Sequence, residues 1–255
     1  MIDLIADGTT VYAITYNVTA DIVSVSLINI SASSSSIINT FSSTVAPTAV
    51  HFVSTGATPA DKHFIFVYPD STQSYKNSFR TLPDLSTATD MVDPVFDRSD
   101  DAAKNSPIIG AYAYGTTIYL ITNEGILITS DDNLANFAAV NKADSSEFMS
   151  LVLNPTGSTA ADFSVPMTIV TKGDTTKLLI MGGISGIYYY DITGLSTDIP
   201  IKFSSEDAFY SNVSSTHILD FYNVPIDADF SLYTATSDKW IWETVDENTA
   251  SSQLL

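Results

Sequence analysis

The sequence contains no cysteine, so disulfide bonds and thiolate metal sites are excluded. Basic residues are also few: eight lysines and two arginines stand against 29 acidic residues, and the net charge is −19. Such a charge repels phosphate groups, so neither nucleic acid nor an anionic membrane surface is an expected partner. We also expect no cofactor, because the sequence has no phosphate-binding loop and no dinucleotide fingerprint.

Long apolar runs are missing as well. No window approaches the ~18 consecutive apolar residues of a membrane-spanning helix, and the first residues, MIDLIADG, lack the features of a signal peptide. Hydrophobic residues still make up 45% of the chain, which is enough for a core. Few lysines, no cysteine and many Ser, Thr and Asn residues favour an extracytoplasmic protein that is periplasmic, surface-bound or secreted. A lipoprotein whose leader or anchoring segment was removed fits these traits.

Five apolar strand cores recur along the chain at nearly constant spacing. Their central positions are 52, 55, 59 and 54 residues apart, and they are Tyr12, Phe64, Tyr119, Leu178 and Leu232. The apolar segment before each core ends in a residue that tolerates a left-handed turn, namely Gly8, Gly56, Gly115, Gly173 and Asn223. After each core, a third strand runs to a polar turn, and a weaker fourth strand follows it. The chain is therefore built of repeated four-strand units.

Repeated units of short strands without helical periodicity predict an all-β protein, a five-bladed β-propeller with blades of about 50–55 residues. The approximate blades are residues 1–47, 48–106, 107–147, 148–213 and 214–255, in a single domain. An elongated solenoid or a two-sheet sandwich is the alternative architecture. Two long connections, residues 86–107 and 142–165, interrupt the spacing, and the second contains an extra strand-like segment, FMSLVLN.

A short stretch of the third unit, SDDNLANF from Ser130 to Phe137, resembles the Asp-box turn of sialidase-like β-propellers. Leu134 stands where that family has glycine, and Phe137 replaces its tryptophan. The resemblance implies a propeller fold and no catalytic residue, because the family's Asp-box lies away from its active site. We expect Asp132 to accept backbone N–H bonds in this turn. Sialidase activity is excluded, since it requires three arginines and the chain has two.

The first strand of each unit is expected to line the central channel of a propeller. Asp3 and His51 occupy equivalent first-strand positions, and Asp220 lies in the fifth first strand, so the three side chains are candidates to converge. They would form a metal site or an acid–base pair, or they are solvated channel-lining groups. We assign no catalytic residue and leave the metal open. His63 is expected to be a packed, hydrogen-bonded residue, and His217 a surface residue.

Aromatic residues are the other candidates for ligand binding. Tyr188 and Tyr190 share one face of a strand, and Trp240 and Trp242 alternate in the same way. Exposed Tyr and Trp side chains stack on sugars and anchor protein interfaces. The alternative is that they fill space between blades.

These features favour a non-catalytic binding scaffold, a monomeric platform for a protein partner. A carbohydrate-binding lectin is the first alternative. A glycoside hydrolase with channel carboxylates is the second, although the aligned first strands supply only Asp3 and Asp220 where such an enzyme needs three acids.

Overall fold

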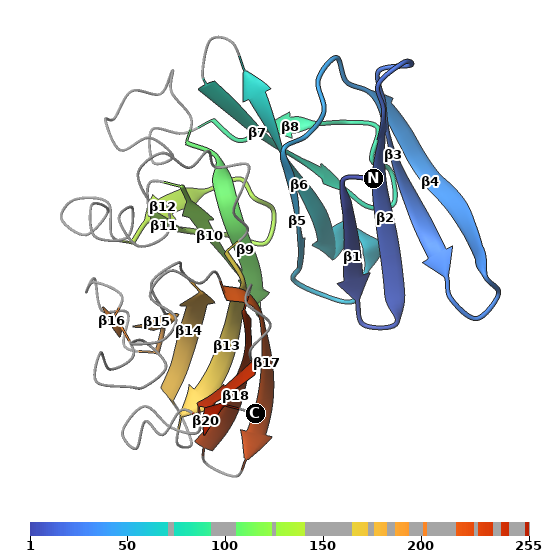
Figure 1. The fold of residues 1–255 in the computed structure, drawn as a ribbon. Coiled ribbons are helices and arrows are strands. Elements are labelled where there is room, and N and C mark those ends of the chain that lie inside the picture. The colour runs from blue at the N-terminus through green and yellow to red at the C-terminus, as the bar shows by residue number, and fades with distance from the viewer. Residues whose placement is uncertain are drawn as a thin grey trace. The chain divides into compact units, whose positions relative to one another are not determined.

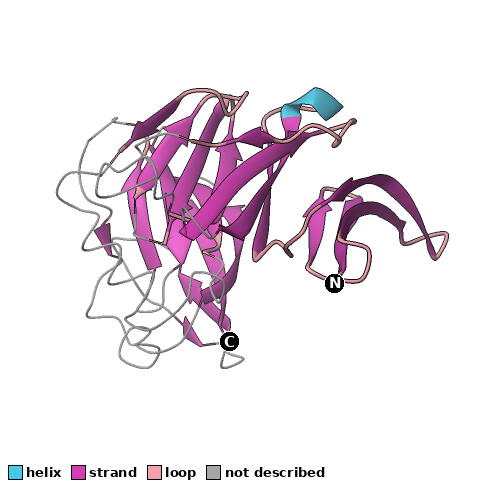
Figure 2. Cartoon of the chain, turned by 90° about the horizontal axis from the view of Figure 1, so that it is seen from above, coloured by secondary structure: helices cyan, strands magenta, loops and turns pink. Residues whose placement is uncertain are grey.

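The structure is a computed structural model. It describes residues 1–70, 74–92, 106–123, 126–140, 165–172, 176–182, 187–193, 201–202, 218–226, 229–236, 241–244 and 253–254. Within these ranges the only helix is one 3-10 turn, η1 (Pro59–Asp61), and all other regular secondary structure is β-strand (Figure 2). No described helix has the length and apolar character needed to cross a membrane.

The described strands form five four-stranded sheets, each with its strands in chain order (Figure 1). The first sheet contains β1 (Asp3–Asp7), β2 (Thr10–Asn17), β3 (Ile22–Asn29) and β4 (Ser34–Ser42). The second contains β5 (Ala49–Ser54), β6 (Lys62–Asp70), β7 (Ser74–Thr81) and β8 (Thr89–Asp90). The third contains β9 (Ile108–Tyr114), β10 (Thr117–Thr122), β11 (Leu127–Ser130) and β12 (Phe137–Ala139).

The fourth sheet contains β13 (Met167–Lys172), β14 (Thr176–Gly182), β15 (Ile187–Asp191) and β16 (Ile201–Lys202). The fifth contains β17 (Ile218–Ile226), β18 (Asp229–Thr236), β19 (Ile241–Thr244) and β20 (Gln253–Leu254). Pairing in the first, second, fourth and fifth sheets is antiparallel. The predicted all-β class and the predicted repeat of four strands in chain order are confirmed. The extra strand predicted within residues 142–165 lies outside the described residues.

Two compact units make up the chain. The first comprises Met1–Ile108, Ala113–Ile118 and Ser130–Phe137, and the second comprises Ile109–Tyr112, Tyr119–Thr129 and Ala138–Leu255.

The core of the first unit lies between the first and second sheets. In β6 every residue from His63 to Tyr68 is buried, as its continuous apolar run predicts for a strand covered on both faces. Phe66 meets the Phe41 ring edge-on at 5.2 Å, and Phe64 meets Tyr12 in the same way at 5.2 Å. Burial of these rings is the main stabilising contribution here, at roughly 2–3 kcal/mol for each aromatic side chain.

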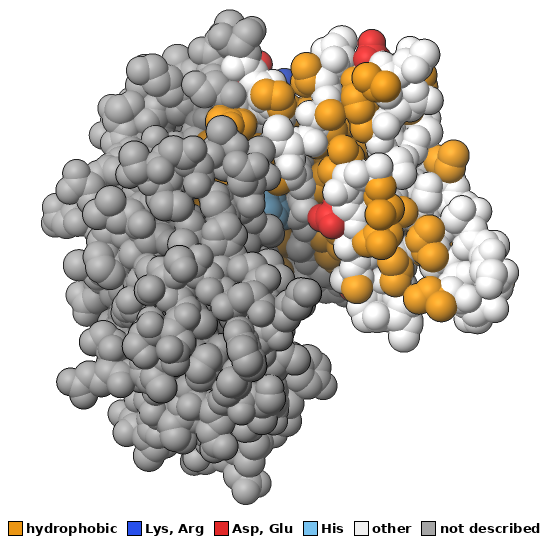
Figure 3. Space-filling view, viewed as in Figure 1, with side chains coloured by type: hydrophobic (Ala, Val, Ile, Leu, Met, Phe, Trp, Pro, Cys, Tyr) orange, Lys and Arg blue, Asp and Glu red, His pale blue; other side chains and the backbone are white. Residues whose placement is uncertain are grey.

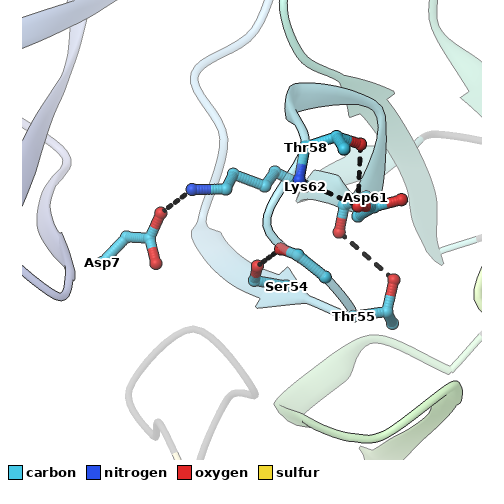
Figure 4. Close-up of polar contacts among 7 residues, drawn as sticks. Asp7, Ser54, Thr55, Thr58, Asp61 and Lys62 are labelled. Carbon is cyan, nitrogen blue, oxygen red and sulfur yellow. Dashed lines mark hydrogen bonds and ion pairs between the residues drawn. The ribbon is translucent and has the colours of Figure 1, made fainter.

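An ion pair joins the same two sheets, and a capped turn lies next to it (Figure 4). The Nζ of Lys62, at the start of β6, lies 2.5 Å from a carboxylate oxygen of Asp7, at the end of β1. This carboxylate raises the pKa of Lys62. In the preceding η1 turn, the Asp61 carboxylate accepts the Thr58 hydroxyl at 2.7 Å and the Thr58 backbone N–H at 2.9 Å. These bonds fix the approach of the chain into β6.

The side of the first sheet that faces away from this core carries no charge, and we call it the uncharged face. Cross-strand pairing places Leu4 beside Ala13, Ala13 beside Ser26 and Ser26 beside Ile37 in one row across the four strands. Leu4 is 54% exposed and Ile37 65% exposed. Figure 3 shows hydrophobic side chains gathered over this sheet at the right of the view. The face mixes apolar residues such as Leu4 and Ile37 with Ser24 and Ser26, so it is uncharged but only partly apolar.

The turn that resembles an Asp-box is stabilised by a different aspartate from the one predicted. Asp131, rather than Asp132, accepts the backbone N–H of Ala135 at 3.0 Å, and it also accepts the Asn136 amide. These hydrogen bonds lower the pKa of Asp131. Leu134 has φ +53°, the left-handed conformation for which glycine is the usual residue, and its side chain is buried. Burial of a leucine therefore outweighs the backbone strain, which is roughly 1–2 kcal/mol.

Candidate binding site

The three residues expected to meet in a channel fall in different surroundings. His51 is buried, and its Nε2 lies 3.0 Å from the carbonyl oxygen of Ile108, to which it donates as a neutral ring. Asp3 is partly buried, and its carboxylate accepts the Leu4 N–H at 2.7 Å. Burial raises the pKa of Asp3. Asp220 lies beside an irregularity in β17, in the other unit, and its side chain is outside the described residues. Their convergence stays a prediction.

Among the described residues, no group of three or more His, Asp or Glu side chains is placed to hold a metal ion. The aromatic candidates lie mostly outside the described side chains. Tyr190 in β15 is 7% exposed, which favours packing over ligand contact for that residue. Tyr188 pairs with Met181 and Trp242 pairs with Thr234 along the backbone. The side chains of Tyr188 and Trp242, and all of Trp240, are outside the description.

His63 is a packed and hydrogen-bonded residue, as predicted. Its Nδ1 lies 2.8 Å from the Thr81 hydroxyl, and its Nε2 lies 2.9 Å from the Asp132 carbonyl oxygen. The ring meets Phe79 edge-on at 5.6 Å. Both ring nitrogens are thus engaged in holding the fold together.

The two buried histidines predict a stability that falls in mild acid. Burial lowers the pKa of His51 and of His63 below the ordinary value of 6.5. Between the lowered and the ordinary values the unfolded chain binds more protons, so stability is full above about pH 6.5 and is lost as the pH falls. We expect the free energy of unfolding to drop by about 1–2 kcal/mol between pH 7 and pH 5.5.

Urea titrations across this range measure the drop. In His51→Gln, which keeps an N–H donor but does not titrate, the slope should be about half as steep. An unchanged slope contradicts the assignment to His51.

A polar pocket is the feature of the first unit that packing alone does not explain. Strand β7 turns Lys76, Ser78 and Arg80 to the side that carries Tyr68, Phe66 and Phe64 on the paired strand β6. This side faces the first sheet, where an apolar contact is expected. Instead the two sheets leave a pocket of about 400 Å³. We call it the Arg80 pocket, and its lining includes Asp21, Tyr68, Lys76, Ser78, Arg80 and Asp90.

Arg80 is the central group of this pocket. Its side chain is 9% exposed, and the Phe41 ring lies against the guanidinium with 3.6 Å from Cζ to the ring centroid. Nη1 donates to the carbonyl oxygens of Leu85 at 2.5 Å and Ser86 at 2.8 Å. Nε has no hydrogen-bond partner. No ion pair joins Arg80 to a carboxylate in the part of the chain that the structure describes. A buried guanidinium without a counter-ion is energetically costly.

Two further groups complete the pocket. Burial raises the pKa of Tyr68 to about 12, so its hydroxyl stays protonated at neutral pH. Lys76 and Asp90 form an ion pair of 2.8 Å, and both are partly exposed. The pocket thus has a buried cation inside and an ion pair towards solvent.

The Arg80 pocket was not among the sites predicted from first strands and aromatic residues. A signal was present in SYKNSFRT, residues 74–81, where Lys76, Ser78 and Arg80 alternate along a strand. Such alternation places three polar side chains on one face of a third strand. The face they share turned out to be the one towards the neighbouring sheet.

Neither a protein-family model nor a curated protein sequence matches the chain. Among solved structures, Sqt1 of Saccharomyces cerevisiae has a TM-score of 0.53 at 12% sequence identity, over 96% of this chain and 57% of Sqt1. BBS1N, solved in complex with ARL6DN, has a TM-score of 0.50 at 10% identity, over 99% of this chain and 64% of BBS1N. The chain spans less than two thirds of either structure.

Both of these structures are β-propeller domains. Their likeness extends along nearly the whole of this chain. Four-stranded sheets repeated in chain order are the building units of the same architecture. The chain therefore has a β-propeller fold.

Proposed function

We propose that this chain is a non-catalytic binding platform that holds a protein partner, and that the Arg80 pocket is part of its binding surface. The observation that carries the proposal is the buried Arg80 guanidinium, which lines an open pocket without a counter-ion from the described residues. The two carbonyl hydrogen bonds and the Phe41 ring hold the guanidinium in the fold, but they do not supply the negative charge of a counter-ion. A partner that supplies the missing interactions would recover the desolvation cost on binding.

Two observations support a protein as the partner. BBS1N, which shares the fold, was solved in complex with ARL6DN. The net charge of −19 favours association with a partner of opposite charge, because complementary potentials raise the rate of encounter. We expect a monomer that binds a basic protein surface.

The test blocks the pocket without altering Arg80. Ala88 lines the pocket and is exposed, so Ala88→Trp fills the space with little effect on the core. Ala32→Trp places the same side chain at an exposed turn and serves as the control.

Tagged wild type, Ala88→Trp and Ala32→Trp would each be incubated with cytosolic and envelope fractions of the native cells. A protein that wild type and Ala32→Trp retain, and Ala88→Trp does not, supports the proposal. Equal retention by all three overturns the pocket as the site. Recovery from the envelope fraction alone would support the extracytoplasmic location proposed from composition.

We further propose that the four-strand units close into a five-bladed ring. The uncharged face of the first sheet supports closure, because its exposed apolar side chains, among them Leu4 and Ile37, would be stabilised by a neighbouring sheet that covers them. If it is covered, Leu4→Glu should destabilise the chain by about 2 kcal/mol or more, since a charge would be buried without a partner. Urea unfolding measures this loss. Val18→Glu, at a position that is 78% exposed in a turn, should stay within about 0.5 kcal/mol of wild type. A Leu4→Glu variant as stable as Val18→Glu would contradict closure over this face.

The lectin alternative stays a prediction, because it depends on Tyr188, Trp240 and Trp242, whose side chains lie outside the description. Binding to a glycan array that is lost in Trp242→Ala would favour it. The glycoside hydrolase alternative depends on Asp3 and Asp220 meeting a third acid. Hydrolysis of a glycan that is lost in Asp220→Asn would favour that reading over a platform.

A further inference from the structure

We propose that the Arg80 pocket recognises a carboxylate on a peptide segment that also carries positive charge. This inference rests on the proposed function and specifies the chemistry of the partner at that site. A carboxylate is the anionic group of a peptide, and its hydrogen bonds to a guanidinium are strengthened by the opposite charges.

Arg80 has hydrogen-bond donors that its contacts within the fold do not use. A guanidinium has five N–H donors, and the described contacts of Arg80 use only Nη1, towards the carbonyl oxygens of Leu85 and Ser86. Nε is buried without a partner. The Phe41 ring occupies one face of the guanidinium. Because Nη1 already makes two hydrogen bonds and Nε is closed to solvent, Nη2 is the nitrogen that can donate to a carboxylate oxygen of a ligand.

Neutral hydroxyl groups lie beside Arg80. The Tyr68 hydroxyl is protonated at neutral pH, and the Ser43 hydroxyl next to it lines the pocket but already donates to the Val45 carbonyl oxygen at 2.6 Å. Ser78 contributes a third hydroxyl between Lys76 and Arg80 on β7. The pocket thus offers hydroxyl donors in addition to the cation. Its volume of about 400 Å³ accommodates a carboxylate together with part of the chain that bears it.

The rest of the pocket lining is acidic. Asp21, Asp70 and Asp90 line the pocket together with Lys76, so the acids outnumber the remaining base. Lys76 is already paired with Asp90. A dianion such as phosphate would meet repulsion from these acids and from the net charge of −19. A carboxylate with a neighbouring lysine or arginine can contact Arg80 without adding net negative charge to this acidic lining.

The experiment uses the full chain and three short peptides in isothermal titration calorimetry at low salt. Acetyl-Lys-Gly-Gly with a free C-terminus carries the carboxylate at its end. Acetyl-Lys-Gly-Glu-Gly-amide carries it on a side chain, and acetyl-Lys-Gly-Gly-amide carries none. We expect the peptide that has no carboxylate to bind at least about 10-fold more weakly than one of the two carboxylate peptides, because it cannot form the charged hydrogen bond to Arg80. Which of those two binds identifies the source of the carboxylate.

Four variants show whether the site is the Arg80 pocket. Ala88→Trp should abolish peptide binding, and Ala32→Trp should not. Tyr68→Phe keeps the buried ring but removes the hydroxyl, and we expect it to weaken the carboxylate peptide by roughly 5–10-fold while the amide peptide is unchanged. Arg80→Lys tests the guanidinium directly, provided that circular dichroism shows an intact fold.

The outcomes separate this inference from the proposed function. Equal binding of all three peptides that Ala88→Trp abolishes would overturn the carboxylate and keep the binding site. Inorganic phosphate that competes as strongly as the carboxylate peptide would show a general anion site and overturn the inference. If no peptide binds while a protein partner is still lost in Ala88→Trp, the inference fails and the proposed function stands.

Discussion

The Gly110→Ala variant is expected to lose about 3 kcal/mol of folding stability, and its midpoint of thermal unfolding to fall by roughly 6–10 °C. Gly110 lies in β9, where an added Cβ would stand 2.7 Å from the Val165 carbonyl oxygen and 3.0 Å from Ile121 Cγ2. The Val165 N–H donates to the Ile109 carbonyl oxygen at 2.7 Å, so the two backbones are held together next to this point. Because the obstacle is a hydrogen-bonded backbone, a side-chain rotation cannot relieve the clash.

The matched control is Gly115→Ala, in the turn that follows the same strand. Gly115 has φ +58° and nothing within 4 Å of an added Cβ, so the cost is the left-handed conformation alone, about 1 kcal/mol. Differential scanning calorimetry of both variants measures the difference. Equal losses in the two variants would show that β9 does not approach Val165 as closely as described.

The Asn77→Leu variant is expected to lose about 3 kcal/mol in urea unfolding. Asn77 is fully buried in β7, its amide donates to the Ser106 carbonyl oxygen at 2.9 Å, and its side-chain oxygen accepts the Ile108 N–H at 3.1 Å. Leucine has a similar volume but leaves both backbone groups buried without partners, at a cost of about 1–3 kcal/mol each. Greater hydrophobicity of leucine offsets part of this loss.

Asn39→Leu is the control for the substitution itself. Asn39 in β4 is only partly buried, and its amide donates to an exposed Asp84 carboxylate at 3.3 Å, so we expect a change within about 0.5 kcal/mol. Asn77→Asp provides a second comparison, because it keeps the acceptor for Ile108 but loses the donor for Ser106. If Asn77→Leu is as stable as Asn39→Leu, the bridge to residues 106 and 108 contributes little.

The regular elements of the fold were open to prediction because they depend on local pattern. The buried run from His63 to Tyr68 indicated a strand covered on both faces, and the turn residue Gly115 has the positive φ that glycine favours. The role of His63 as a packed residue also followed from its place at the start of a buried strand. Such conclusions need only the period of the sequence and the chemistry of single residues.

The candidate site could not be predicted in the same way, because it depends on which strand faces pair across sheets. Arg80 lines a pocket only because the face of β7 that carries it is turned towards the first sheet. The carbonyl partner of His51 lies 57 residues further along the chain, and that of His63 lies 69 residues further. In the Asp-box-like turn, Asp131 accepts the backbone N–H bond that we predicted for Asp132. The two carboxylates are adjacent in the sequence, and the sequence alone did not show which of them points at the backbone N–H groups.

The buried polar side chains of the second sheet limit how far this repeat protein is modular. His51 bonds to the Ile108 carbonyl, Asn77 bonds to Ser106 and Ile108, and His63 bonds to the Asp132 carbonyl. A truncation after residue 106, at the predicted repeat boundary, would remove Ile108 and Asp132, so each of these three buried side chains would lose a hydrogen-bond partner. The first two repeats are therefore not an autonomous folding module. Shuffling or grafting of repeats in this protein would have to carry the start of the following repeat and its Asp-box-like turn along with them.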